Sequence, residues 1–264
     1  MGVLNDLKIL WRESRYLPYI GATNKEDSNG KYDELNLLNS IPSASRLALG
    51  VLTGIGSWNE KPQIMKIGNL NKEKERWYFI NGICTDLTVL KLNTTYLSEI
   101  FGTQITAMWN PTRGIVPDLI ECATGRTFDR NETFTSAYGT LIENSLQSGY
   151  KVKLIGHSQG GIIVSNMIKF MSETRKDFSN LEVYTFASAA DGEQKRVSLF
   201  QEHFGNEEDF VHRIGLGAEE YKPSILWRRS GGKGHLLNIH YLNAFKEGRL
   251  CNKKSKLYSH MMVK

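Results

Sequence analysis

Cysteine is scarce in this sequence. Of the 264 residues only three are cysteines, Cys84, Cys122 and Cys251, and they are widely spaced. An odd number without a CxxC pair gives neither a disulfide framework nor the ligand spacing of a zinc finger. Such usage is typical of a reducing compartment. We therefore expect a cytoplasmic protein that has no metal site.

Long apolar runs are also missing. No stretch reaches the roughly 20 residues that a membrane-spanning helix needs. Six charged or polar side chains interrupt the first 20 residues: Asn5, Asp6, Lys8, Arg12, Glu13 and Arg15. Their presence leaves no continuous apolar core of the kind that a signal peptide has. We expect neither a signal peptide nor a membrane span.

Charge of one sign is concentrated only near the end of the chain. The formal net charge is +5, but basic and acidic residues are interspersed up to about residue 245, and no nucleic-acid-binding motif is present. We therefore expect no nucleic-acid partner. Residues 246–264 are rich in lysine, which indicates either a solvated end or a weak attraction to an acidic membrane surface.

The length and the 40% hydrophobic content allow one large α/β domain. We expect residues 1–58 to form a helical arm and a connecting segment, and residues 59–264 to form the main α/β domain on which they pack. In the arm, Leu4, Leu7, Leu10 and Trp11 share one face of a predicted short helix that ends before Pro18. The apolar, glycine-broken residues 43–58 are either a buried connecting helix or a mobile flap.

The central feature is residues 151–172, an apolar run that is interrupted by glycines and a serine and then resumes with helical spacing. The pattern predicts a strand, a sharp turn and a helix, with Ser158 in the turn. Gly156 and Gly160 flank that serine as G-x-S-x-G, the nucleophile elbow, in which only glycine leaves room for the neighbouring strand and helix. The amide of Gln159 then points toward a developing oxyanion.

With this motif between a strand and a helix, the sequence resembles the serine lipases and esterases of the α/β-hydrolase fold over about residues 77–245. The resemblance implies a mostly parallel central sheet with helices on both faces. The spacing of apolar residues agrees with this order and predicts a hairpin of two strands, further strands and intervening helices. The predicted hairpin strands are 62–67 and 76–80, the other strands 104–109, 181–187, 202–206 and 224–228, and the helices 87–101, 133–146 and 236–245.

The resemblance also assigns site residues. The loop after the strand 76–80 would complete the oxyanion hole, with the backbone amide of Ile83 acting together with that of Gln159. Lipases often carry His-Gly where this chain has Asn81-Gly82. The alternative interpretation of Asn-Gly is a simple turn that ends a strand.

The resemblance also implies a Ser-His-Asp triad, in which the acid and then the histidine follow the serine along the chain. Asp209 lies in an N-x-x-D-x-V segment typical of the acid, and Asp191 is the alternative. His235, last in the order, is the predicted general base. We expect His240 to pack or cap a helix, and His157 to shape the pocket.

These residues predict a serine hydrolase, without a cofactor, that cleaves carboxylic esters as a lipase or esterase does, on a small-molecule ester or a lipid. A thioesterase or an acyltransferase would use the same triad. A non-catalytic binding or scaffold protein on this fold is the alternative from another class.

Overall fold

A twisted seven-stranded sheet forms the centre of the molecule, with the strand order β1-β3-β2-β4-β5-β6-β7. We describe it from a computed structural model, in which residues 3–21, 31–34, 63–70, 72–82, 85–110 and 132–262 are defined. β1 runs antiparallel to β3, and the remaining neighbours pair in parallel. The strands are β1 (Gln63–Ile67), β2 (Glu75–Ile80), β3 (Ile105–Trp109), β4 (Lys151–His157), β5 (Leu181–Phe186), β6 (Phe200–Asn206) and β7 (Leu226–Arg229).

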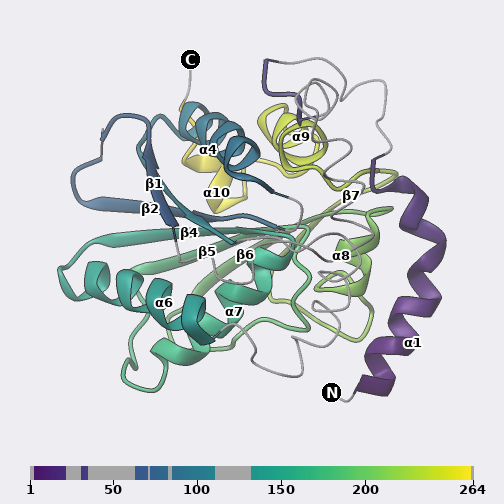
Figure 1. Cartoon of the computed structure of the whole chain (residues 1–264), viewed down its shortest axis with the longest axis horizontal. Helices are drawn as coiled ribbons and strands as arrows, with labels where there is room; N and C mark the ends of the chain where they lie inside the picture. The colour runs from purple at the N-terminus through teal and green to yellow at the C-terminus, as the bar shows by residue number, and fades with distance from the viewer. Residues whose placement is uncertain are drawn as a thin grey trace.

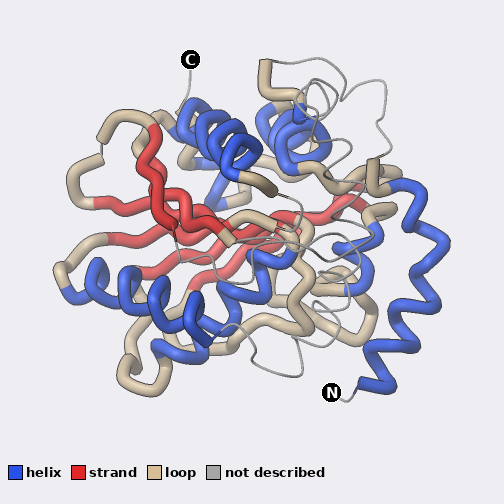
Figure 2. The backbone as a smooth tube through the Cα atoms, in the orientation of Figure 1, coloured by secondary structure: helices blue, strands red, loops and turns tan. Residues whose placement is uncertain are grey.

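Helices cover both faces of this sheet (Figures 1 and 2). On one face lie α4 (Leu87–Phe101), α9 (Asn243–Lys246) and α10 (Lys256–Ser259), and on the other lie α6 (Glu132–Gln147) and α7 (Gln159–Met171). A short α8 (Phe210–Ile214) follows β6, and the π-helical turn η2 (Leu237–Leu242) leads into α9. The expected α/β-hydrolase fold class is confirmed by this mostly parallel, doubly covered sheet.

The core consists of two apolar layers, one on each face of the sheet. Neighbouring residues of β4 divide between them: Ile155 packs with the α4 layer, and Leu154 packs with the layer of α6 and α7. Successive side chains of a strand point to opposite faces, so a strand buried on both sides must be apolar throughout. This is why the near-continuous apolar run before Ser158 forms the central strand.

The predicted hairpin of residues 62–67 and 76–80 is wrong. Both segments are strands, but β1 pairs with β3 rather than with β2. β3 is buried at every residue and therefore fits between two strands, whereas β1 is half-exposed and fits the edge. The crossover through α4 inserts β3 between the two earlier strands.

The N-terminal arm forms a helix, although the predicted apolar face is partly wrong. α1 (Val3–Glu13) continues as the 3-10 turn η1 (Ser14–Tyr19), which contains Pro18. Ile9 is buried against α8, whereas Trp11 is 83% exposed. The proposed boundary at residue 58 and the segment 43–58 lie outside the described residues. No helix in the described ranges is long and apolar enough to cross a membrane.

Candidate active site

Ser158 lies in the sharp bend that the motif predicts, between the end of β4 and the start of α7. Its φ is 58°, a conformation that residues other than glycine adopt only under strain. The flanking glycines make this bend possible. A Cβ on Gly160 would lie 2.5 Å from the carbonyl oxygen of Ile80, and one on Gly156 would lie 3.0 Å from that of Gly160. The Ser158 amide donates to the Phe186 carbonyl at 3.0 Å, which fixes the bend to β5.

The Ser158 hydroxyl is the first member of a chain of two hydrogen bonds. Ser158 Oγ lies 2.8 Å from Nε2 of His235, and Nδ1 of His235 lies 2.8 Å from Oδ2 of Asp209. All three side chains are buried. The histidine comes from the loop after β7, and the acid comes from the turn between β6 and α8. The structure thus brings together three residues that are far apart in the sequence.

Asp209 is completely buried, and four donors compensate its charge. Oδ2 accepts from His235 and from the Tyr241 hydroxyl at 2.6 Å, while Oδ1 accepts from the amides of Val211 and His212 at the start of α8. Burial alone would raise its pKa, but the charge of His235 and the hydrogen bonds outweigh this and hold the pKa below its usual value. The side chain is therefore a carboxylate at neutral pH. Asp191, the alternative acid, lies beyond the end of β5 and is partly exposed.

The backbone of His235 is held from both sides. Its carbonyl lies 2.9 Å from Nε2 of His157, whose ring stacks on the His235 ring with 4.9 Å between centroids. Burial lowers the pKa of His157 to about 3, so this ring is neutral and its Nε2–H donates. The His235 amide donates to the Ile20 carbonyl of the N-terminal arm at 2.9 Å. His157 thus lies directly against His235, and neither this contact nor the one with Ile20 was predicted.

The loop that carries His235 is fixed by Asn206, at the end of β6. Asn206 Nδ2 lies 3.2 Å from the carbonyls of both Lys233 and Gly234, and its backbone amide donates to the Tyr241 hydroxyl at 3.0 Å. His240 caps the turn by accepting from the Leu236 amide at 2.9 Å, in line with the sequence-based expectation. Neither Asn206 nor Tyr241 was among the candidates. Asn206 is the first residue of the N-x-x-D-x-V segment, which could have marked it, whereas nothing in the local sequence distinguishes Tyr241 from a core residue.

On the other side of Ser158 lies a network of buried amides. Asn81 Nδ2 donates to the carbonyls of Gly82 and Asn110 at 2.8 and 2.9 Å, and Asn81 Oδ1 accepts from the Asn110 amide at 2.7 Å. Asn110 Nδ2 then donates to Oε1 of Gln159 at 2.6 Å. The network joins the ends of β2 and β3 to the first turn of α7.

This network sets the position of the predicted oxyanion loop. A Cβ on Gly82 would lie 2.4 Å from Cβ of Ser158, so the backbone at Gly82 lies directly against the serine side chain. Gln159 is the first residue of α7, where the amide has no acceptor within the helix. Ile83 lies outside the described residues.

Comparison with known proteins gave matches among solved structures only. No family model matches the chain, and no curated protein matches its sequence. An arylesterase is 10% identical and is similar over 86% of this chain and 99% of its own, with a TM-score of 0.43. A thermostable esterase from Pseudomonas putida ECU1011 is 10% identical over 96% and 97% of the two chains, with a TM-score of 0.45. A hyperthermophilic esterase from the archaeon Pyrobaculum calidifontis is 11% identical over 83% and 92%, with a TM-score of 0.45. At these identities the likeness concerns the fold alone.

The site has the groups that acyl transfer requires. A hydroxyl, an imidazole and a carboxylate follow one another at hydrogen-bond distance, and the imidazole nitrogen facing the hydroxyl can accept its proton. In the part of the chain that the structure describes, no three His, Cys, Asp or Glu side chains are grouped so that they could hold a metal ion.

Proposed function

We propose that this protein is a serine hydrolase that cleaves carboxylic esters through an acyl-enzyme. Ser158 is the nucleophile, His235 the general base and acid, and Asp209 the carboxylate that orients the imidazole. The observation that carries the proposal is the pair of 2.8 Å contacts from Ser158 Oγ through His235 to Asp209. A buried structural serine would need only one such partner.

The reaction follows from this order of groups. As Ser158 Oγ attacks the acyl carbonyl, Nε2 of His235 takes its proton, and Asp209 stabilises the imidazolium. The oxyanion accepts hydrogen bonds from the amides of Gln159 and Ile83. The imidazolium then protonates the leaving alcohol, and the acyl group stays on Oγ. Water, deprotonated by the same histidine, releases the acid and restores the serine.

Hydrolysis of a chromogenic short-chain ester tests this proposal. Ser158→Ala should reduce turnover by about a thousandfold or more, because it removes the nucleophile. Circular dichroism should show the variant folded, since the substitution deletes a single oxygen. A variant that retains wild-type turnover would rule out the mechanism.

The substrate class within this reaction is a small-molecule ester or a lipid, which we expect the protein to meet in the cytoplasm or weakly bound at a membrane surface. Thioester hydrolysis and transfer to an alcohol use the same three residues. Rates on esters of graded acyl length, on the matching thioesters and with an added alcohol acceptor separate the three activities. A rate that rises only in the presence of a lipid interface would indicate a lipase.

A further inference from the structure

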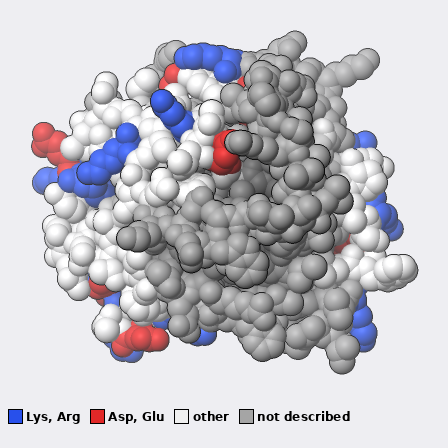
Figure 3. Space-filling model, in the orientation of Figure 1, with Lys and Arg blue, Asp and Glu red and all other residues white. Residues whose placement is uncertain are grey.

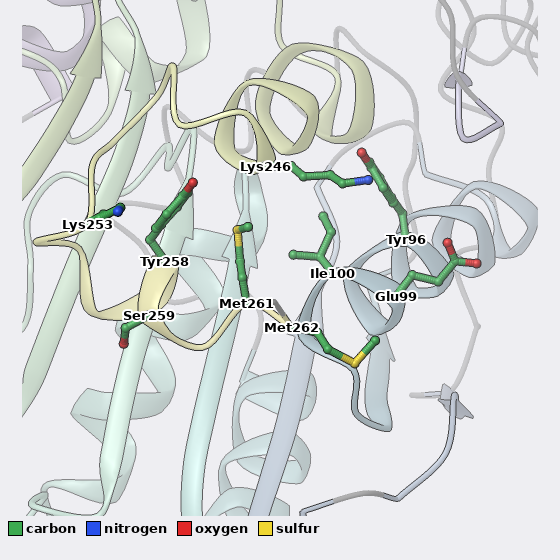
Figure 4. Close-up of a pocket in the computed structure, with 9 residues that line it drawn as sticks. All are labelled: Tyr96, Glu99, Ile100, Lys246, Lys253, Tyr258, Ser259, Met261 and Met262. Carbon is green, nitrogen blue, oxygen red and sulfur yellow. The ribbon is translucent and has the colours of Figure 1, made fainter. Parts of the chain in front are cut away.

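A cavity of about 630 Å³ lies between the end of α4 and the C-terminal segment that contains α10 (Figure 4). This volume is in the range of small-molecule binding sites. Three residues of α4, one of α9 and five of the C-terminal segment line it: Tyr96, Glu99, Ile100, Lys246, Lys253, Tyr258, Ser259, Met261 and Met262.

The cavity is separate from the candidate active site. Ser158 lies at the carboxyl end of β4, where the parallel strands present their active-site loops. α4 starts after the carboxyl end of β2 and runs back toward the start of β3. Its last turns therefore lie near the amino-terminal ends of the parallel strands, away from Ser158. No triad residue lines the cavity.

The lining has the character of a site for an acyl chain. Ile100 and Met261 form an apolar middle, and Met262 lies beside them (Figure 4). Methionine side chains are flexible and adapt to an apolar ligand. Lys253 lies at one end of this apolar middle, and Lys246 extends toward Tyr96 at the other. An anionic head group therefore meets an ammonium group in either orientation of the chain.

The charges of the C-terminal segment favour this interpretation. Lys256 is paired with Glu182 at 3.0 Å, and Arg249 is paired with Glu247 at 2.6 Å. In contrast, neither Lys246 nor Lys253 forms a salt bridge with any residue in the described ranges. The acidic residue of the lining, Glu99, is paired with Lys31 at 3.2 Å, which offsets its charge.

We infer that this cavity binds a single-chain carboxylate amphiphile, an anion of the fatty-acid class, as a free molecule. The inference is independent of the proposed esterase activity, since it uses none of the same residues. It also gives the lysine-rich end of the sequence a specific ligand in place of a diffuse attraction to a membrane.

Calorimetric titration tests the inference with three ligands below their micelle-forming concentrations: dodecanoate, octanoate and dodecyltrimethylammonium. Dodecanoate should bind saturably and at least tenfold more tightly than the cation with the same chain length. Octanoate should bind more weakly than dodecanoate, because each buried methylene contributes up to about fourfold in affinity. Equal binding of the carboxylate and the cation would overturn the inference, because it would indicate a merely apolar surface.

Charge reversal locates the site. The double variant Lys246→Glu/Lys253→Glu should weaken dodecanoate binding about tenfold or more, since two attractions become repulsions. Lys254→Glu is the matched control, because this exposed lysine belongs to the same segment but does not line the cavity; it should change affinity less than twofold. Equal effects of the double variant and the control would overturn the inference. So would binding to phosphatidylserine vesicles in the absence of any binding of free dodecanoate.

Discussion

At the scale of single residues, the account depends on which carboxylate holds the imidazole. Asp209 contacts Nδ1 of His235 and also accepts a hydrogen bond from the hydroxyl of Tyr241. An asparagine there would keep the size of the side chain but present an amide to the ring, which favours the wrong tautomer. In the proposed mechanism, Asp209 therefore acts on the base through both its charge and the tautomer that it favours.

We predict that Asp209→Asn lowers kcat for ester hydrolysis by about 10⁴-fold, as loss of the triad acid does in serine proteases. Asp191→Asn is the control and should stay within about threefold of the wild type, because partly exposed polar substitutions of this kind cost little. Steady-state kinetics on one chromogenic ester measures both. The opposite ranking of the two variants would identify Asp191 as the acid.

In the proposed mechanism, Asn81 positions the oxyanion loop and does not touch the substrate. Its side chain makes three hydrogen bonds that hold Gly82 and Asn110 around the first turn of α7. We predict that Asn81→Ala lowers kcat about tenfold or more with little change in KM, because a misplaced oxyanion donor affects mainly the transition state.

Asn93→Ala supplies the matched control for Asn81→Ala, since Asn93 is also buried but belongs to α4. Urea unfolding of both variants separates a loss of stability from a loss of transition-state binding. If the two substitutions reduce kcat equally, or if Asn81→Ala raises KM alone, Asn81 has no role in positioning the loop.

At the scale of elements, the turn η2 that follows His235 is capped from a distant part of the chain. Glu34 accepts hydrogen bonds from the amides of Asn238 and Ile239 at 2.8 and 3.2 Å, and the Tyr32 carbonyl accepts from Asn238 Nδ2 at 2.9 Å. Glu34 is buried, and this burial raises its pKa to about 7. The carboxylate therefore caps the amides of η2 but lies in an environment that disfavours its charge.

We predict that the stability of Glu34→Gln, relative to that of the wild type, increases as pH rises. A carboxyl group with a raised folded-state pKa favours folding while it is protonated, so the wild type loses stability between the unfolded pKa near 4.5 and the folded pKa near 7. The amide does not titrate. The free energy of unfolding of the variant, relative to that of the wild type, should increase by about 2–3 kcal/mol from pH 5 to pH 8. Urea unfolding at the two pH values measures this difference, and parallel pH profiles would contradict it.

The helices and strands also differ in how far they could be predicted from the sequence. Strands and helices follow from local periodicity, so the central strand, the bend at Ser158 and the helix after it were all predicted. The partner of β1 was predicted wrongly, because β3 reaches its place only after the crossover through α4. Ile20 accepts a hydrogen bond from the His235 amide, and Tyr241 donates one to Asp209, but both contacts form only in the folded chain. No local pattern marks them.

At the scale of the whole molecule, the N-terminal arm connects the parts that carry the acid and the base. Glu13 is buried and accepts from Nε of Arg213 in α8 at 2.5 Å and from Nε of Arg12 at 2.6 Å, while the Ile20 carbonyl holds the amide of His235. α1 lies beside α8 in Figure 1. On the face shown in Figure 3, basic and acidic side chains both occur over the described surface. The docking of the arm rests on the specific contacts of Glu13 and Ile20.

We predict that Glu13→Ala lowers the free energy of unfolding by about 2 kcal/mol, because it leaves Arg213 without its buried partner. Burial by itself would raise the pKa of Glu13, but the two arginines outweigh this and lower it, so the contribution is present above the unfolded pKa and is lost as pH falls below it. Glu220→Ala removes the exposed partner of the same Arg12 and should cost about 0.5 kcal/mol or less. Urea unfolding at pH 7 measures both, and equal losses would show that the arm is not held through Glu13.

The central claim is that His235 activates Ser158, and covalent labelling tests it most directly. The protein is incubated with a fluorophosphonate, digested and examined by mass spectrometry, alongside a folded His235→Ala variant. The account predicts an adduct on the peptide that contains Ser158 in the wild type, and labelling slowed by about a thousandfold or more in the variant. A folded wild-type protein that carries no adduct on Ser158, or a variant labelled at the same rate as the wild type, would contradict it.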